Sequence, residues 1–205
     1  MATYLVMIGP PGAGKGTQAS RLAENLGLAH VSTGDMFRDN IRDDTQLGAR
    51  VKMLLASGTL VPDELTIAMV RDRIQHPDCH QGCVLDGFPR TPVQADALDS
   101  MLAEQGSLVN IAPYISLDDG AAIERLTGRR TDRRTGKTYH LRYDPPPEDA
   151  ELEQRPDDSE ETVQHRLDEY YENTAPLLDY YSERGVLQEF DGGLGIDALT
   201  EALMM

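Results

Sequence analysis

A glycine-rich segment with a single lysine, Gly9 to Thr17, carries the strongest chemical signal in the sequence. It reads GPPGAGKGT and lies between a short apolar run and a helical pattern, which is typical of a phosphate-binding loop. Glycines let the backbone curl until successive N–H groups point at phosphate oxygens, and Lys15 adds a mobile positive charge. Gly16 stands where a Ser or Thr usually follows the lysine, and the hydroxyl comes one residue later, at Thr17. We expect this segment to bind the phosphate chain of a nucleotide rather than to form a plain glycine turn. GTPases, motor ATPases and small-molecule kinases all use such a loop.

Further motifs follow this loop along nearly the whole chain. They are Gly9 to Gln18 (GPPGAGKGTQ), Ser32 to Met36 (STGDM), Leu85 to Arg90 (LDGFPR), Gly128 to Arg130 (GRR), Arg155 to Asp158 (RPDD), Glu161 to Val163 (ETV) and Arg166. With these motifs in this order, the chain resembles the adenylate kinases. DGFPR together with GxPGxGKGTQ is specific for nucleoside monophosphate kinases, and the Ser-Thr-Gly-Asp element points to the adenylate branch. The resemblance implies reversible Mg²⁺-dependent phosphoryl transfer, ATP + AMP = 2 ADP, which serves adenine nucleotide homeostasis and salvage.

The 16 arginines contrast with only three lysines, and several of them fall in or beside the motifs. Phosphoryl transfer brings two polyanions together, and a guanidinium that stays protonated pairs bidentately with phosphate. By resemblance, the groups that hold the phosphates and the group in flight are Lys15, Arg90, Arg129, Arg155 and Arg166. Each arginine alone would be interpreted as an ordinary surface residue. Their coincidence with the motifs favours a shared cleft instead.

The resemblance also implies which residues surround each nucleotide. Around ATP these are Gly12, Ala13, Gly14, Lys15, Gly16, Thr17, Arg125, Arg129, Thr138, Tyr139 and Leu194. Around AMP they are Thr33, Arg38, Thr59, Leu60, Val61, Gly87, Phe88, Pro89, Arg90, Gln94, Arg155 and Arg166. The amide of Gln94 both donates and accepts, which suits the edge of adenine. Leu194 would offer a backbone carbonyl to the ATP adenine amine, and Arg125 would lie against that ring. Asp86, at the end of an apolar strand, would hold Mg²⁺ through water.

The elements that must position these residues alternate between strands and helices. Apolar runs predict strands at 4–8, 83–85, 109–117 and 186–190, and helical patterns cover 17–26, 63–75, 92–104, 119–127 and about 160–184. Polar helical segments at 35–41 and 46–56 show no obvious strand between them. This order predicts an α/β fold of the phosphate-loop NTPase type, with a parallel sheet of about five strands flanked by helices. Pro176 predicts a kink or break in the long C-terminal helix.

Two segments interrupt that alternation, and we expect each to be a small insertion. The expected core is 1–31, 62–127 and 159–205, with a helical AMP-binding insertion at 32–61 and a lid insertion, built around a hairpin, at 128–158. Residues 128–142 hold six basic and one acidic side chain, whereas 144–161 hold nine acidic and one basic. A lid of this kind would close over ATP and exclude water, with Asp157 and Asp158 able to pair with arginines in the closed state.

The sequence gives no support for a structural metal. Many relatives with a long lid bind zinc through cysteines, but 130–155 contains no Cys, and Asp132 and Thr135 stand at the corresponding spacing. We expect a hydrogen-bonded polar cluster there and no zinc. His76, Cys79, His80 and Cys83 have metal-like spacing, but the segment leads into an apolar strand that should bury Cys83.

Charge and composition exclude several classes of protein. A net charge of -16 disfavours a partner such as nucleic acid or an anionic membrane, and no apolar run approaches the roughly 20 residues that span a bilayer. The N-terminus lacks a basic region and is interpreted as a first strand, so we expect a cytoplasmic protein, and by resemblance a monomer.

The alternative functions are a kinase for UMP, CMP or GMP, a nucleotide-binding regulator without catalysis, and an acidic interaction protein. The last of these rests on net charge alone.

Overall fold

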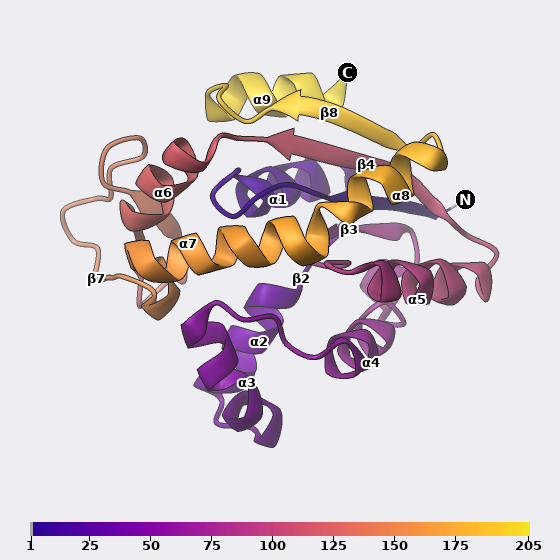
Figure 1. Ribbon diagram of the computed structural model, residues 1–205, viewed down its shortest axis with the longest axis horizontal. Coiled ribbons are helices and arrows are strands. Elements are labelled where there is room, and N and C mark those ends of the chain that lie inside the picture. The colour runs from indigo at the N-terminus through magenta and orange to yellow at the C-terminus, as the bar shows by residue number, and fades with distance from the viewer. Residues whose placement is uncertain (1) are drawn as a thin grey trace.

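A five-stranded, all-parallel sheet forms the centre of the computed structural model, which describes residues 2–205 (Figure 1). Residue 1, which the expected core includes, lies outside the described residues. The strands follow the spatial order β2-β3-β1-β4-β8 and comprise β1 (Thr3–Met7), β2 (Ala29–Ser32), β3 (Gly82–Asp86), β4 (Val109–Ser116) and β8 (Leu187–Asp191). The predicted fold class and number of strands are confirmed.

Helices cover both faces of the sheet, which explains why its central strand is apolar from Tyr4 to Met7. They are α1 (Lys15–Leu26), α4 (Asp63–Arg73), α5 (Pro92–Ala103), α6 (Asp119–Thr127), α7 (Glu160–Glu169), α8 (Pro176–Glu183) and α9 (Ile196–Met204). Along β1, Tyr4, Val6 and Ile8 point into one core cluster. Leu5 and Met7 point into the opposite cluster, in keeping with the two-residue period of a strand.

Two elements of the core were not predicted from the sequence. Strand β2 is only four residues long, and Ala29-His30-Val31-Ser32 lacks a continuous apolar run because it lies at the edge of the sheet. Helix α9 follows β8 closely. The four-residue spacing of Leu199 and Leu203, which both pack on the core, could have indicated this helix.

The break predicted at Pro176 is confirmed. A π-helical turn, η3 (Tyr170–Thr174), separates α7 from α8, and the Ala175 N–H donates to the Tyr170 carbonyl at 2.8 Å. Because proline has no N–H to continue the ladder, the wider turn is accommodated directly before it.

The segment between β2 and α4 holds the two expected polar helices, α2 (Thr33–Arg42) and α3 (Gln46–Ser57). Ser32 and Thr45 cap them by accepting hydrogen bonds from the N–H groups of Asp35 and Gly48. Their apolar sides meet in a small cluster of their own that includes Phe37 and Val51.

The segment after α6 forms a three-stranded antiparallel sheet rather than the simple hairpin we expected. Strand β5 (Arg129–Asp132) lies between β6 (Thr138–His140) and β7 (Leu152–Glu153). Strand β7 has only two residues, too few to give a pattern. A short 3-10 turn, η2 (Pro156–Asp158), then contacts α3, so this segment touches the one before it. None of the helices in residues 2–205 is long and apolar enough to cross a membrane.

Candidate functional site

The glycine-rich loop lies between β1 and the start of α1, as its motif predicts. Gly12 and Gly14 adopt the left-handed conformation, with φ of 83° and 95°, which lets the loop turn into the helix. A side chain at Gly12 would meet the Ala122 carbonyl oxygen at 2.9 Å, so glycine is also required by space. Gly16 and Thr17 on the first turn are exposed, and Ala13 is buried.

Lys15 folds back over this loop. Its Nζ donates to the carbonyl oxygens of Gly9 at 2.7 Å and Pro10 at 2.8 Å. Burial lowers the pKa of Lys15 to about 7, and the nearby Arg90 adds to this shift while Asp86 opposes it. The lysine is therefore poised to gain positive charge when an anion enters the loop.

Asp86 ends β3 directly beside the loop. Burial by itself would raise the pKa of Asp86, but His30, Lys15 and Arg90 more than offset it and hold that pKa below its ordinary value. His30 Nε2 lies 3.7 Å from Asp86 Oδ2. The carboxylate thus stays ionised at neutral pH.

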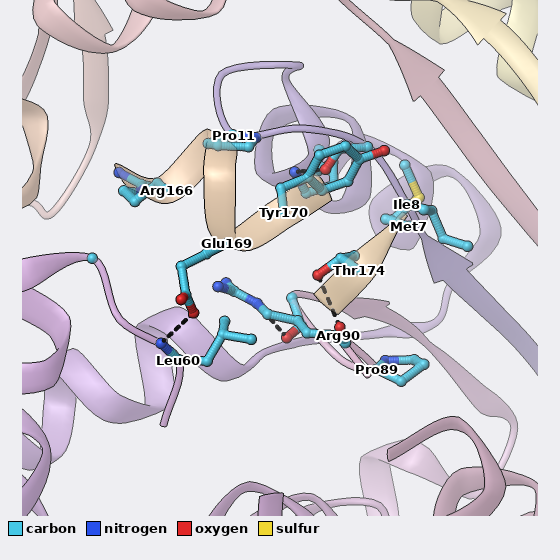
Figure 2. Close-up of a pocket in the computed structure, with 14 residues that line it drawn as sticks. Met7, Ile8, Pro11, Leu60, Pro89, Arg90, Arg166, Glu169, Tyr170 and Thr174 are labelled. Atoms are coloured by element: carbon cyan, nitrogen blue, oxygen red, sulfur yellow. Dashed lines mark hydrogen bonds between the residues drawn. The ribbon is translucent and has the colours of Figure 1, made fainter. Parts of the chain in front are cut away.

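Two cavities lie next to each other beside the loop. The central cavity is lined by Lys15, Gly87, Pro89, Arg90 and Arg166 together with Pro11, Leu60, Glu169, Tyr170 and Thr174 (Figure 2). The insertion cavity is lined by Thr33, Arg38, Thr59, Leu60, Val61, Gly87, Arg90, Gln94, Asp157 and Arg166. Arg90 and Arg166 line both, so they form part of a shared wall.

Arg90 is held in place from three sides. Its Nε donates to the Gly87 carbonyl at 2.9 Å, and its own carbonyl accepts the Thr174 hydroxyl at 2.8 Å. Figure 2 shows the contact between Thr174 and Arg90. The figure also shows a separate contact, in which the Leu60 N–H lies 3.4 Å from the Glu169 carboxylate. The backbone N–H of Arg90 is bound by Gln94 at 2.8 Å. The arginine is thus positioned by the loop after β3, by η3 and by α5.

Arg129 and Arg166, both after α6, carry aspartate partners. Arg129 pairs with Asp158, and Arg166 pairs with Asp157 at 2.8 Å, so each aspartate has an arginine partner. That these pairs belong to a closed lid stays a prediction. Arg155 instead donates to the hydroxyls of Thr131 and Thr138 at 3.2 and 3.1 Å. Burial, with the other arginines nearby, lowers the pKa of Arg155 and of Arg166 to about 10. Both remain charged at neutral pH.

The residues expected around the insertion cavity are mostly brought together there. Thr33 is buried, and its hydroxyl donates to the Gly87 carbonyl at 2.9 Å. Arg38 lies at the cavity wall, paired with Asp35. Gln94 is buried beside them, whereas Phe88 packs wholly into the core.

Other expected residues lie outside both cavities. Arg125 donates to the Gly192 carbonyl at 2.8 Å, close to Leu194, whose side chain is exposed. Thr138 accepts from Arg155, and Tyr139 lies under the ammonium of Lys137, 4.8 Å from the ring centre.

Several residues at the site were missed from the sequence. Glu169, Tyr170 and Thr174 line the central cavity, and His30 contacts Asp86. The recurrence of Arg166, Tyr170 and Thr174 every four residues could have revealed the last two, since this spacing puts them on one helical face. His30 had no such signal, because its strand was not recognised.

The regions considered for metal binding are occupied by other contacts. Asp132 is buried and accepts the Arg134 N–H at 2.8 Å, while Thr135 accepts the Lys137 N–H at 3.2 Å, so each side chain makes its own contact with the backbone of the turn. Cys79 and Cys83 are buried free thiols, and Arg73 donates to the Cys79 sulfur. Across residues 2–205, no three His, Cys, Asp or Glu side chains form a group that could hold a metal ion.

Comparison with known proteins gives a consistent result. A family model described as adenylate kinase matches residues 7–186. An adenylate kinase of Moorella thermoacetica is 50% identical over 206 residues, which cover 97% of this chain and 95% of that protein. One from Acidothermus cellulolyticus is 51% identical over 202 residues, with 95% and 90% covered. One from Archaeoglobus fulgidus is 46% identical over 202 residues, with 95% and 93% covered.

Proposed function

This chain belongs to the adenylate kinase family, and we propose a role in phosphoryl transfer for each of its site residues. The protein is a phosphotransferase that interconverts ATP plus AMP with two ADP. The observation that carries the proposal is the wall that the two cavities share. Because Arg90 and Arg166 face both, a phosphoryl group crossing from one nucleotide to the other would pass beside them.

On the ATP side, the loop N–H groups and Lys15 would hold the phosphate chain, with Arg129 and Arg155 reaching it from the lid. We assign the lid to 128–158, the AMP-binding insertion to 32–61, and the core to the remainder. Arg125 and Leu194 would contact the adenine, since both lie next to the Gly192 turn. Thr138 and Tyr139 would cover it from the lid.

On the AMP side, Arg38 and Arg90 would bind the phosphate, while Thr33, Gln94 and the backbone of 59–61 would contact the base. Gly87 supports this arrangement because a side chain there would lie 2.8 Å from the Thr33 hydroxyl and 3.0 Å from the Arg90 guanidinium. The absence of a side chain at Gly87 lets the Thr33 hydroxyl and the Arg90 guanidinium lie close to the backbone there, at the wall of the insertion cavity.

The residues present suit Mg²⁺ bound together with ATP. Asp86 is an ionised, half-buried carboxylate beside the loop, and a side chain in place of Gly16 would crowd its Oδ2 at 3.2 Å. We assign Asp86 to hold the ion through water. The ion would neutralise phosphate charge when bound, whereas Lys15 and the arginines position the two nucleotides and stabilise the charge that spreads in the transition state.

We infer a cytoplasmic monomer whose partners are ATP, AMP and ADP. The lid would need no zinc, because the Asp132 turn supplies internal hydrogen bonds in its place.

Initial rates test this proposal. The Arg90→Ala variant should lose phosphoryl transfer by roughly two to three orders of magnitude, as is typical for donors that stabilise transition-state charge. Arg50→Ala, which removes an exposed arginine of α3, is the control and should keep full turnover. AMP should be preferred over UMP, CMP and GMP in a coupled assay with ATP and Mg²⁺. Near-normal turnover of the Arg90 variant, or nucleotide binding without turnover in the unmodified protein, would refute the proposed roles.

A further inference from the structure

The amide of Gln94 is held in one orientation by partners whose donor and acceptor roles are unambiguous. Its Oε1 accepts the backbone N–H of Arg90 at 2.8 Å, and its Nε2 donates to Asp63 Oδ1 at 2.7 Å. A backbone N–H only donates and an ionised carboxylate only accepts. Turning the amide over would place Nε2 against the N–H and Oε1 against the carboxylate, so both contacts would become repulsive.

Asp63 is itself fixed by the helix that carries Gln94. Asp63 begins α4, and its Oδ2 accepts the Thr91 hydroxyl at 3.1 Å. The same Thr91 oxygen accepts the backbone N–H of Gln94 at 3.2 Å as the N-cap of α5. The carboxylate therefore bridges the start of α5 and the Gln94 side chain. The sequence separates these partners by 31 residues, and nothing in the motifs had indicated Asp63.

The constrained amide can still make two further hydrogen bonds. One N–H of Nε2 and one lone pair of Oε1 remain after the contacts to Asp63 and Arg90 are made. Gln94 is 2% exposed and lines the insertion cavity together with Thr33 and Val61. A base in contact with this amide therefore faces one acceptor and one donor in fixed positions.

We propose that Asp63 is a positioning residue for base selection, which acts by holding the Gln94 amide in the orientation that matches a 6-aminopurine. This inference rests on the proposed function, in which Gln94 contacts the AMP base. Adenine presents a donor at its 6-amino group and an acceptor at N1, which pair with Oε1 and with the Nε2 N–H. A 6-oxopurine presents O6 and an N1–H, the reverse pattern, and it would require the amide to turn over against Asp63 and Arg90.

The test compares AMP with IMP, the 6-oxopurine that differs from AMP at this edge alone. Asp63→Asn keeps the shape of the side chain but offers either an acceptor or a donor, so position 63 no longer opposes the turned amide and only the Arg90 N–H still does. Its ratio of kcat/KM for AMP to kcat/KM for IMP should fall about tenfold, the scale of one well-placed hydrogen bond. The KM for ATP should not change. Because both substrates are measured on the same sample, the ratio does not depend on how much of the variant is folded.

Two further variants make the outcome decisive. Glu64→Gln removes an exposed carboxylate from the same first turn of α4 and should leave the ratio unchanged within about twofold, as expected for a surface substitution. Gln94→Ala should lower the ratio at least as much as Asp63→Asn. If Gln94→Ala lowers it and Asp63→Asn does not, the role of Asp63 is refuted while the proposed AMP site stands. If Gln94→Ala leaves the ratio unchanged, the assignment of Gln94 to the base is refuted, and the inference about Asp63 with it.

Discussion

Arg129 and Asp158 form a bidentate ion pair in which the aspartate is completely buried. Arg129 Nε lies 2.9 Å from Asp158 Oδ2, and Arg129 Nη2 donates to Oδ1. Arg166 approaches the same carboxylate at 3.6 Å. One buried anion thus orients two guanidinium groups that we assign to phosphate binding. The protein's own contacts therefore fix the arrangement of these positive charges.

Replacing Asp158 by Asn should therefore destabilise the protein. The substitution keeps the shape of the side chain but leaves the largely buried Arg129 without its counterion, a change that typically lowers the free energy of unfolding by about 3 kcal/mol. Urea denaturation followed by circular dichroism measures this loss. Asp149→Asn is the matched control, because Asp149 pairs with Arg134 at 3.5 Å with its side chain 82% exposed. It should change the stability by less than about 0.5 kcal/mol. Equal losses in the two variants would show that burial does not set the strength of the Arg129 pair.

Local motifs made most of the core and of the phosphate loop predictable. The glycines of Gly9 to Thr17 indicated the phosphate loop because its backbone conformation requires glycine at fixed positions. Apolar runs of three or more residues indicated four of the five strands. Pro176 located the π-helical turn, since a missing N–H has a local effect.

Contacts between distant segments could not be predicted in the same way. Asp63 reaches Gln94, and Glu169 reaches the Leu60 N–H, over separations of 31 and 109 residues. No local pattern records such a pair when only one sequence is read. The two-residue strand β7 was missed for a related reason, because pairing with β5 rather than its own sequence defines it as a strand.

The lid turn should owe its stability to Asp132 rather than to a metal. A strong zinc chelator should leave the thermal unfolding midpoint unchanged, whereas Asp132→Ala should lower the free energy of unfolding by about 1–2 kcal/mol, because the Arg134 N–H loses its acceptor. Differential scanning calorimetry with and without chelator measures both effects. Thr135→Ala, on the exposed part of the turn, should change stability by less than about 0.5 kcal/mol. A midpoint that falls with chelator would mean that the lid does bind a metal.

The hydroxyl of Thr174 should matter for turnover because it holds the main chain of Arg90. Thr174→Val has nearly the same shape but removes the hydrogen bond to the Arg90 carbonyl, so it should lower stability by about 1 kcal/mol and raise the KM for AMP. Thr174→Ser keeps the hydroxyl and should restore both values. Steady-state kinetics and thermal unfolding of the two variants give the comparison. A serine variant as impaired as the valine variant would assign the effect to packing of the methyl group instead.

Binding of ATP should be coupled to uptake of a proton by Lys15. Burial lowers the pKa of this lysine to about 7 in the free protein, and the phosphate anions should raise it again toward its ordinary value of 10.5. Below about pH 7 the lysine is already charged, so no proton is taken up there. At about pH 8 to 9 the free lysine is largely neutral, and each ATP bound should bring close to one proton with it. A binding reaction that takes up a proton weakens as pH rises, so the Kd should increase by up to tenfold per unit of pH above about 7.

Isothermal titration calorimetry at about pH 8 in two buffers of different ionisation enthalpy measures the protons taken up, and the ATP phosphates are themselves fully ionised under these conditions. Lys52→Gln, which removes an exposed lysine of α3, should take up as many protons as the unmodified protein. Lys15→Gln should lose the uptake together with much of the affinity. A binding enthalpy that is independent of buffer at this pH would show that Lys15 does not change its charge when ATP binds, and it would refute the coupling proposed from its burial beside Gly9 and Pro10.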